Sequence, residues 1–247
     1  CHSYELPEYV NKTTLIISCS YSGNTEETLS TLDEAFAKGA LIIGITSGGK
    51  LEQLLKAKNC KVIKVPGGLP PRSALAYPLI QIIQVLELGG FLKSELIGQV
   101  GESIPLLRNH QEEIIALAKD LLERLRDKKI LLYSEDKFRP VLLRTCQQIN
   151  ENSKELAFFN VIPEMNHNEI VGWAKDPVDM FVVFLRSNLE NDRNTRRLDI
   201  TSEVVAAKSQ SISVNAKGAN LVEQTLYAIH VFDWLSYLKA EDKGIDV

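Results

Sequence analysis

The sequence has few of the residues that would build a metal centre or a disulfide framework. Its 247 residues include 4 cysteines and 2 methionines, and the cysteines are far apart, with no CxxC pair. Zinc sites and disulfide scaffolds rely on closely spaced ligands or many cysteines, so we expect neither a zinc site nor a disulfide framework. This cysteine usage predicts a cytoplasmic protein.

Long apolar runs and an excess of positive charge are also missing. No apolar run reaches the length of a membrane span, so we expect no membrane association. The 28 lysines and arginines are outnumbered by 32 aspartates and glutamates, and without a basic surface the chain is not expected to bind nucleic acid. The apolar share of 45% is ample for the core of one large or two modest domains.

Strand and helix patterns alternate along the chain, which predicts an α/β fold with mostly parallel sheets flanked by helices. Apolar runs predict strands over 13–19, 40–46, 61–65, 129–133, 157–160, 178–186 and 211–214. Helical spacing of apolar residues predicts helices over 26–38, 51–57, 73–88, 108–126, 139–152 and 221–239. We therefore expect two related α/β units: a first domain over 1–107, a connecting helix over 108–127 and a second domain over 128–247.

The segment 20–28, SYSGNTEET, follows the first expected strand and opens the first expected helix. The hydroxyls of Ser20, Ser22 and Thr25 can donate to phosphate oxygens, while Gly23 allows a tight turn. The first N–H groups of a helix point toward a bound anion. A turn that merely caps the helix would account for one hydroxyl but not for three, so the pattern favours a phosphate site.

A second polar cluster contains a carboxylate and an imidazole. Glu151 lies in NENSK, where a helix is expected to end, and His167 lies in PEMNHNEIVGW. A carboxylate can move a proton between adjacent carbons, and an imidazole can pass a proton to or from a ring oxygen near neutral pH. The alternatives are a solvated acid at a helix end and a histidine at a helix start capped by Asn166. Glu164 and Glu169 are competing carboxylates that spacing does not exclude.

A third element, PPRSA at residues 70–74, places Arg72 at the head of a long apolar helix. The two prolines favour an extended approach to that helix. Arg72 is equally compatible with a surface ion pair and with a guanidinium that stabilises oxyanion charge in a cleft.

These motifs resemble those of a known family. SYSGNTEET is similar to the phosphate loop of sugar isomerase (SIS) domains. PPRSALAY, NENSK and PEMNHNEIVGW together resemble the bifunctional phosphoglucose/phosphomannose isomerase family, and the resemblance runs from the YELPEYV segment at 4–10 to the last expected helix. It implies two SIS domains in one chain, and a homodimer in which the histidine enters the site across the subunit boundary.

The resemblance also implies residue roles and a reaction. Ser20, Ser22 and Thr25 would bind the sugar phosphate, and Glu151 would move hydrogen between C1 and C2. His167 would assist ring opening, and Arg72 would stabilise a cis-enediolate. The implied activity is interconversion of glucose 6-phosphate, and of mannose 6-phosphate, with fructose 6-phosphate, without a metal or organic cofactor. The alternatives are a non-catalytic sugar-phosphate-binding SIS protein and an isomerase of another phosphosugar.

Two family features are not found in this sequence. The family pattern starts with a strand and a glycine-serine loop before the YxLPxY segment, so we expect the first domain to be truncated here by about one βα unit. The family pattern also ends with a lysine-bearing helix, and neither Lys239 nor Lys243 stands at the matching place. We therefore assign the ring-opening role of that lysine to neither residue.

Overall fold

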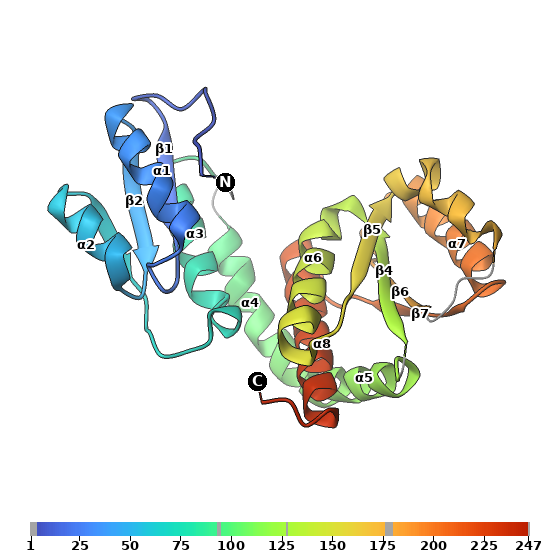
Figure 1. Cartoon of the computed structure of the whole chain (residues 1–247). Helices are drawn as coiled ribbons and strands as arrows, with labels where there is room; N and C mark the ends of the chain where they lie inside the picture. The colour runs from blue at the N-terminus through green and yellow to red at the C-terminus, as the bar shows by residue number, and fades with distance from the viewer. Residues whose placement is uncertain (1–3, 93–94, 127, 176–179, 247) are drawn as a thin grey trace. The chain divides into compact units, whose positions relative to one another are not determined.

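The apolar runs of the sequence form the strands of two separate parallel sheets. The computed structural model describes residues 4–92, 95–126, 128–175 and 180–246 (Figure 1). The chain divides into two units, Cys1–Ile97 and Gly98–Val247. The predicted α/β class, with parallel sheets flanked by helices, is confirmed.

The sheet of the first unit has the strand order β1-β2-β3, and both strand pairs are parallel. Its strands are β1 (Leu15–Cys19), β2 (Leu41–Thr46) and β3 (Lys61–Lys64), and its helices are α1 (Glu26–Ala37), α2 (Gly49–Ala57), the 3-10 turn η1 (Pro71–Ser73) and α3 (Ala76–Leu88). Leu32 of α1, Ile42 of β2 and Leu55 of α2 belong to one buried cluster. Because the strands are parallel, the connections that follow them all leave the same edge of the sheet.

The sheet of the second unit has the order β5-β4-β6-β7, again with parallel neighbours throughout. The strands are β4 (Lys129–Glu135), β5 (Phe158–Ile162), β6 (Met180–Arg186) and β7 (Gln210–Asn215). The helices are α5 (Gln111–Arg124), the 3-10 turn η2 (Asp136–Phe138), α6 (Arg139–Gln148), the π-turn η3 (Ile149–Ser153), the 3-10 turns η4 (Glu164–His167) and η5 (Glu169–Ala174), α7 (Asp192–Ala206) and α8 (Leu221–Asp242). Helix α4 (Leu96–Asn109) spans the division between the units.

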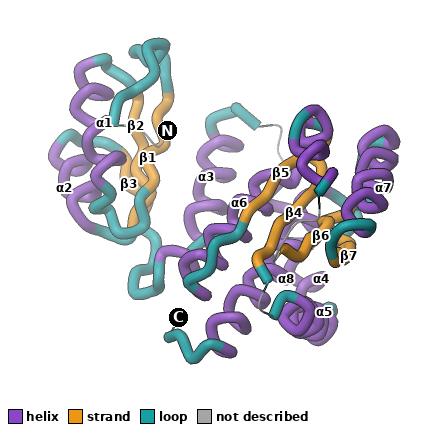
Figure 2. The backbone as a smooth tube through the Cα atoms, turned by 45° about the vertical axis from the view of Figure 1, so that its right-hand side comes forward, coloured by secondary structure: helices purple, strands orange, loops and turns teal. Residues whose placement is uncertain are grey.

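Alternating side chains of β4 and β6 enter two different cores, one on each face of this sheet. Leu132 and Val183 join residues of α5, α6 and α8 in the larger cluster. Tyr133 and Phe184 join Met165, Trp173 and residues of α7 in the smaller one. Figure 2 shows this second sheet between helices on either side. The segment 164–174, which carries the PEMNHNEIVGW motif, therefore packs on the face that α7 covers.

Several expected elements end at different residues in the structure. The helix expected over 108–126 is α5, which begins at Gln111, after the separate helix α4 has ended at Asn109. The helix expected over 139–152 is α6 followed by the π-turn η3, and the strand expected over 157–160 is shifted to Phe158–Ile162. Helix α7 was not expected at all. Residues 178 and 179 of another expected strand lie outside the described residues.

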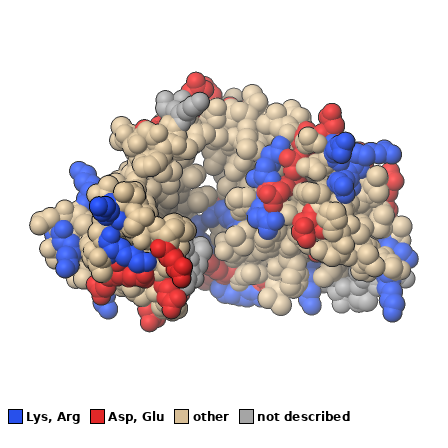
Figure 3. Space-filling model, turned by 90° about the horizontal axis from the view of Figure 1, so that it is seen from above, with Lys and Arg blue, Asp and Glu red and all other residues tan. Residues whose placement is uncertain are grey.

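Charges of both signs are present on each unit on the face seen in Figure 3. In the view of Figure 3, lysines and arginines lie among aspartates and glutamates on both units. Among the described residues, no helix is long and apolar enough to cross a membrane. Within the same residues, no three His, Cys, Asp or Glu side chains are grouped so that they could hold a metal ion.

Candidate active site

The hydroxyl-rich loop connects β1 to α1 at the carboxyl edge of the first sheet. The Oγ of Ser20 and the Oγ1 of Thr25 share a hydrogen bond of 2.7 Å, and the amide of Gly23 donates to Ser20 Oγ at 3.1 Å. Thr25 is the residue before α1, yet its side chain makes no capping hydrogen bond to the helix. Ser20 is buried, whereas Ser22 and Thr25 are exposed. Thr25 therefore does not act as the cap that the alternative requires. The hydroxyls of Ser20 and Thr25 meet at the start of α1, while Ser22 Oγ accepts from the amide of Asn24.

Gly23 is required by the close approach of this loop to the loop that follows β2. Its φ is 69°, and a Cβ at this position would lie 1.8 Å from the carbonyl oxygen of Gly48. The amide of Ser47 donates to the carbonyl of Tyr21 at 3.0 Å, and Ser47 Oγ donates to the same carbonyl at 2.7 Å. The two loops therefore form one braced structure, in which any residue other than glycine at position 23 would clash with the backbone.

Arg72 lies in the connection that follows β3, on η1, and its side chain is half-buried. Tyr21 links the start of this connection to the hydroxyl-rich loop. Its phenol donates to the carbonyl of Pro66 at 3.0 Å and accepts from the amide of Leu69 at 3.2 Å. The structure thus ties the connection that carries Arg72 to the loop that carries Ser20, Ser22 and Thr25.

Glu151 lies on a π-turn, an arrangement that occurs frequently at functional sites. Its carboxylate is exposed, while the next two residues are buried and bonded to α8. Asn152 Nδ2 donates to Ser236 Oγ at 3.0 Å, and Ser153 Oγ donates to the carbonyl of Ser236 at 3.1 Å. The turn ends at Lys154, which has the left-handed φ of 57°. The exposed carboxylate is therefore carried by a backbone that is fixed on its buried side.

The two lysines considered at the end of the chain are held near this turn by one carboxylate. Glu155 Oε1 lies 3.2 Å from Lys239 Nζ and 2.5 Å from Lys243 Nζ. Lys239 is 5% exposed, and a buried ammonium requires such a partner. These contacts describe a structural ion-pair group that fastens η3 and β5 to α8.

His167 is the last residue of η4 and is exposed, although its neighbours are firmly held. Met165 is fully buried, and Asn166 Nδ2 donates to Thr201 Oγ1 of α7 at 2.9 Å. Asn166 does not cap a helix here; Asn168 does, because its Oδ1 accepts from the amide of Glu169 at 2.6 Å. The alternative of a histidine at a helix start capped by Asn166 therefore does not hold, because His167 ends one 3-10 turn and Asn168 caps the next.

The competing carboxylates are distinguished by their partners. Both oxygens of Glu169 accept hydrogen bonds, one from the phenol of Tyr133 and the other from Asn160 Nδ2 at 2.5 Å. Glu164 is exposed and accepts from Asn168 Nδ2 at 3.2 Å. The carboxylate of Glu169 is therefore engaged within the protein. The residues Tyr133 and Asn160 were not singled out from the sequence, since each stands alone in an apolar strand.

Glu151 and His167 lie at opposite ends of β5. Asn150 Oδ1 accepts from the amide of Ala157, just before the strand, while His167 follows the end of the strand at Ile162. At about 3.3 Å per residue, β5 separates its ends by roughly 13 Å. The two residues are also on opposite faces, because η3 joins α6 and α8 whereas segment 164–174 joins α7. Within one chain, the length of β5 and the two faces of the sheet therefore separate Glu151 from His167.

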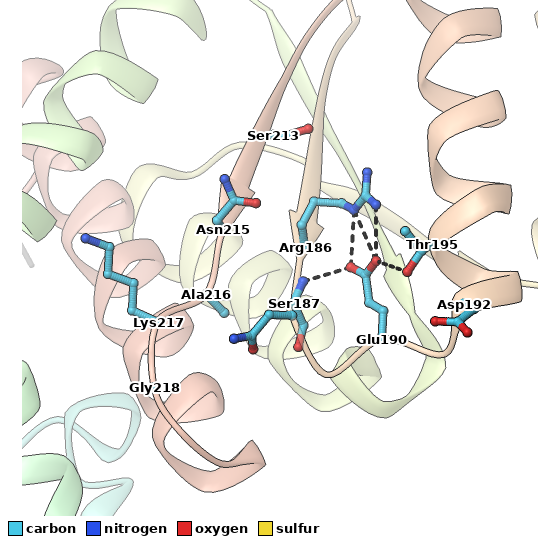
Figure 4. A pocket seen from close by; sticks show the side chains of 11 residues that line it. Arg186, Ser187, Glu190, Asp192, Thr195, Ser213, Asn215, Ala216, Lys217 and Gly218 are labelled. Carbon is cyan, nitrogen blue, oxygen red and sulfur yellow. Dashed lines mark hydrogen bonds and ion pairs between the residues drawn. The ribbon is translucent and has the colours of Figure 1, made fainter.

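A pocket of about 740 Å³ lies where β6 and β7 end in the second unit (Figure 4). It contains no residue that was selected from the sequence. Its loop occupies the place, after a strand and before a helix, that the hydroxyl-rich loop occupies in the first unit. Here the carboxylate of Glu190 fills the loop: it accepts from the amide of Ser187 at 2.7 Å, from Thr195 Oγ1 at 3.1 Å and from Arg186 Nη2 at 3.1 Å.

The parallel α/β fold and the hydroxyl-rich loop between β1 and α1 indicate the class of the protein, which is the sugar isomerase (SIS) type. The solved structure of glucosamine-6-phosphate deaminase from Thermotoga maritima has the same fold, with a TM-score of 0.70 at 16% identity, over 98% of this chain and 74% of that one. Residues 114–247 match the family model of the bacterial phospho-glucose isomerase C-terminal SIS domain.

Two curated relatives narrow the assignment. The bifunctional phosphoglucose/phosphomannose isomerase of Aquifex aeolicus is 34% identical over 98% of this chain and 75% of its own length. A D-glucosamine-6-phosphate 4-epimerase from Sulfolobus acidocaldarius is 29% identical over 86% of this chain and 68% of its own length. The chain belongs to the bifunctional phosphoglucose/phosphomannose isomerase family, as its motifs predict.

Proposed function

We propose that this chain is an aldose–ketose isomerase that interconverts glucose 6-phosphate, and mannose 6-phosphate, with fructose 6-phosphate through a cis-enediolate. Membership of the family supports the substrate class and the reaction. The observation in this chain that carries the proposal is the exposed carboxylate of Glu151, held on a π-turn whose next two residues are bonded to α8. Such a carboxylate is accessible to a substrate, and the turn that carries it is held in place, as suits a general base.

The hydroxyl-rich loop supplies binding energy that does not change during the reaction. Ser20, Ser22 and Thr25 hold the phosphate at the start of α1, where the helix dipole favours a negative charge. Since the phosphate is remote from C1 and C2, this contact lowers KM and orients the reacting carbons. The brace through Tyr21 and Ser47 supports a loop that needs little rearrangement when the sugar binds.

The chemical steps are proton transfers. His167 takes the proton of the C1 hydroxyl and returns one to the ring oxygen, which opens the pyranose. Glu151 removes the proton from C2 of the open aldose, which gives the cis-enediolate, and delivers it to C1. The hydroxyl proton of O2 passes to O1, so that the carbonyl moves from C1 to C2. Arg72 stabilises the negative charge of the enediolate oxygens. None of these steps calls for a metal or an organic cofactor.

We propose a homodimer in which each site receives Glu151 from one copy and His167 from the other. The support is the separation of these residues at opposite ends and on opposite faces of the edge strand β5. Helix α3 adds to it, because it is mostly apolar and none of its residues is buried, so it offers surface for a second copy. The absence of CxxC pairing in the sequence supports a cytoplasmic location.

Incubation of the protein with fructose 6-phosphate in deuterated water tests the proposal. An isomerase incorporates deuterium at C2 of the glucose 6-phosphate and mannose 6-phosphate that are recovered. Protection against heat by fructose 6-phosphate without exchange would instead indicate a non-catalytic binding protein. The epimerase among the relatives favours one further candidate, an enzyme for an amino-sugar phosphate, and absence of both exchange and protection with fructose 6-phosphate would direct attention to it.

A further inference from the structure

A partly buried hydrogen-bond network connects the segment that carries His167 to the sheet. The phenol of Tyr133 donates to Glu169 Oε1, Asn160 Nδ2 donates to Glu169 Oε2 at 2.5 Å, and Trp173 Nε1 donates to the phenol oxygen at 3.1 Å. Tyr133 belongs to β4, Asn160 to β5, and Glu169 and Trp173 to η5. The network therefore fastens segment 164–174 to two neighbouring strands of the sheet.

The surroundings of this network make its hydrogen bonds strong. Tyr133 is fully buried and Trp173 is 5% exposed. Together with Glu169 they line a pocket of about 390 Å³ whose other walls are mostly apolar, including Leu131, Phe159 and Met180. Hydrogen bonds that are shielded from bulk water are stronger than exposed ones, and a buried donor left without a partner is costly. Burial, and then the bond to Glu169, raises the pKa of the Tyr133 phenol, so the phenol stays protonated and donates at neutral pH.

Segment 164–174 is fixed on both sides of His167. On one side Asn166 is bonded to Thr201 of α7 at 2.9 Å, and on the other Asn168 caps the amide of Glu169 at 2.6 Å. The imidazole itself is exposed and has no hydrogen bond or ion pair with the described residues. The direction in which the imidazole reaches is consequently set by the backbone of this segment and not by bonds of its own.

We propose that Glu169 is a positioning residue for ring opening: through Tyr133 and Asn160 it fixes the backbone on which His167 approaches the sugar. The proposal rests on the function proposed above for His167. It also assigns the competing carboxylate a different task from Glu151. Both oxygens of Glu169 are occupied by donors from the sheet, whereas Glu151 is exposed.

The substitution Glu169→Gln tests this role with little change of volume. A glutamine keeps one acceptor oxygen but turns an NH2 donor toward the second donor of the network, so one of the two anchoring bonds is lost. We expect kcat with glucose 6-phosphate to fall about tenfold to a hundredfold, because a small displacement of a catalytic group can slow a reaction by such a factor. KM should stay within about threefold, because the phosphate contacts are unchanged. Tyr133→Phe removes the other end of the same bond and should act in the same direction.

Glu164→Gln is the matched control. It makes the same chemical change five residues away, on an exposed side chain that accepts one bond from Asn168. We expect its kcat to stay within about twofold of the wild type, since exposed polar contacts contribute little. An equal loss of kcat in the Glu164→Gln variant would overturn the proposal, because the effect would then follow from the charge alone.

A double-mutant cycle with His167→Asn separates positioning from direct participation. If Glu169 acts through His167, Glu169→Gln should lower kcat by less than about twofold once the imidazole is gone. If Glu169→Gln lowers kcat by its full factor in the His167→Asn background as well, the positioning role is overturned. It is also overturned if Glu169→Gln alone abolishes turnover as completely as Glu151→Gln does.

Amide hydrogen exchange of segment 164–174 distinguishes failure of this proposal from failure of the proposed function. Faster exchange in this segment of the Glu169→Gln variant, with peptides of the first unit unchanged, is expected whether or not the protein isomerises sugars. Unchanged exchange would overturn the positioning role alone. An unreactive wild type with the expected faster exchange would overturn the proposed function, and with it the role toward His167.

Discussion

The phenol of Tyr21 donates a hydrogen bond of 3.0 Å to the carbonyl oxygen of Pro66, across 45 residues of sequence. The phenol oxygen of Tyr21 in turn accepts a hydrogen bond from the amide of Leu69. Tyr21 lies within the hydroxyl-rich loop, and residues 66–69 begin the connection that leads to Arg72. One side chain thus joins the two parts of the first unit that are proposed to bind the phosphate and the enediolate.

Tyr21→Phe should loosen this link without emptying any core, because the ring remains and only the hydroxyl is lost. We expect a loss of stability of about 1 kcal/mol for these partly exposed bonds, together with a several-fold increase in KM for fructose 6-phosphate. Urea unfolding and steady-state kinetics measure the two effects. Tyr9→Phe, at a residue that is 75% exposed, serves as the control; an unchanged KM in Tyr21→Phe would show that the link does not support binding.

Glu151→Gln should abolish turnover and leave phosphosugar affinity within a few-fold of the wild type. The amide cannot accept the C2 proton, whereas the turn that carries it is held by Asn152 and Ser153 and should keep its shape. Turnover is followed by deuterium incorporation at C2, and affinity by calorimetry with fructose 6-phosphate, which the inactive variant does not consume. A kcat near that of the wild type would remove Glu151 from the role of base.

Ser22→Ala combined with Thr25→Ala should raise KM strongly and lower kcat little. Each lost hydrogen bond to a charged phosphate is worth about 1.5–3 kcal/mol, so two of them correspond to at least a hundredfold in affinity. Thr13→Ala, on an exposed threonine before β1, provides the matched control. A KM within a few-fold of the wild type in the double variant would place the phosphate elsewhere.

The equivalent loop of the second unit should respond to substitution by unfolding and not by losing affinity. The side chain of Glu190 is 3% exposed, and its carboxylate accepts hydrogen bonds from Arg186, Ser187 and Thr195. Glu190→Ala should therefore cost about 3 kcal/mol, because it leaves three half-buried donors without their acceptor. Asp199→Ala removes the other carboxylate from Arg186, but one that is 45% exposed, and should cost less than about 1 kcal/mol. Equal losses of unfolding free energy in the two variants, measured by urea unfolding, would contradict the structural role given to Glu190.

The sequence predicted what depends on apolar periodicity and on local turn chemistry. The two parallel sheets, most of their strands and the loop before α1 follow from such patterns. Helix α7 did not, because its sequence DRNTRRLDITSEVVA is largely polar and buries few residues, among them Leu198 and Val205. The network around Glu169 was not predicted either, because Tyr133 and Asn160 come close to Glu169 only when β4 and β5 pair. Long-range pairing of single polar residues leaves no signal at any local spacing.

Mixing two inactive variants tests whether the catalytic pair comes from two copies of the chain. Within one chain Glu151 precedes β5 and His167 follows it, on opposite faces of the sheet. If each site combines residues of both copies, a dimer of one Glu151→Gln chain and one His167→Asn chain holds one intact site and one doubly altered site. Random exchange of equal amounts gives such mixed dimers in half of the population, so about a quarter of the wild-type activity should return.

The control is to verify chain exchange with differently tagged chains. If activity then stays at the level of the separate variants, each copy builds its own site and β5 does not keep the two residues apart.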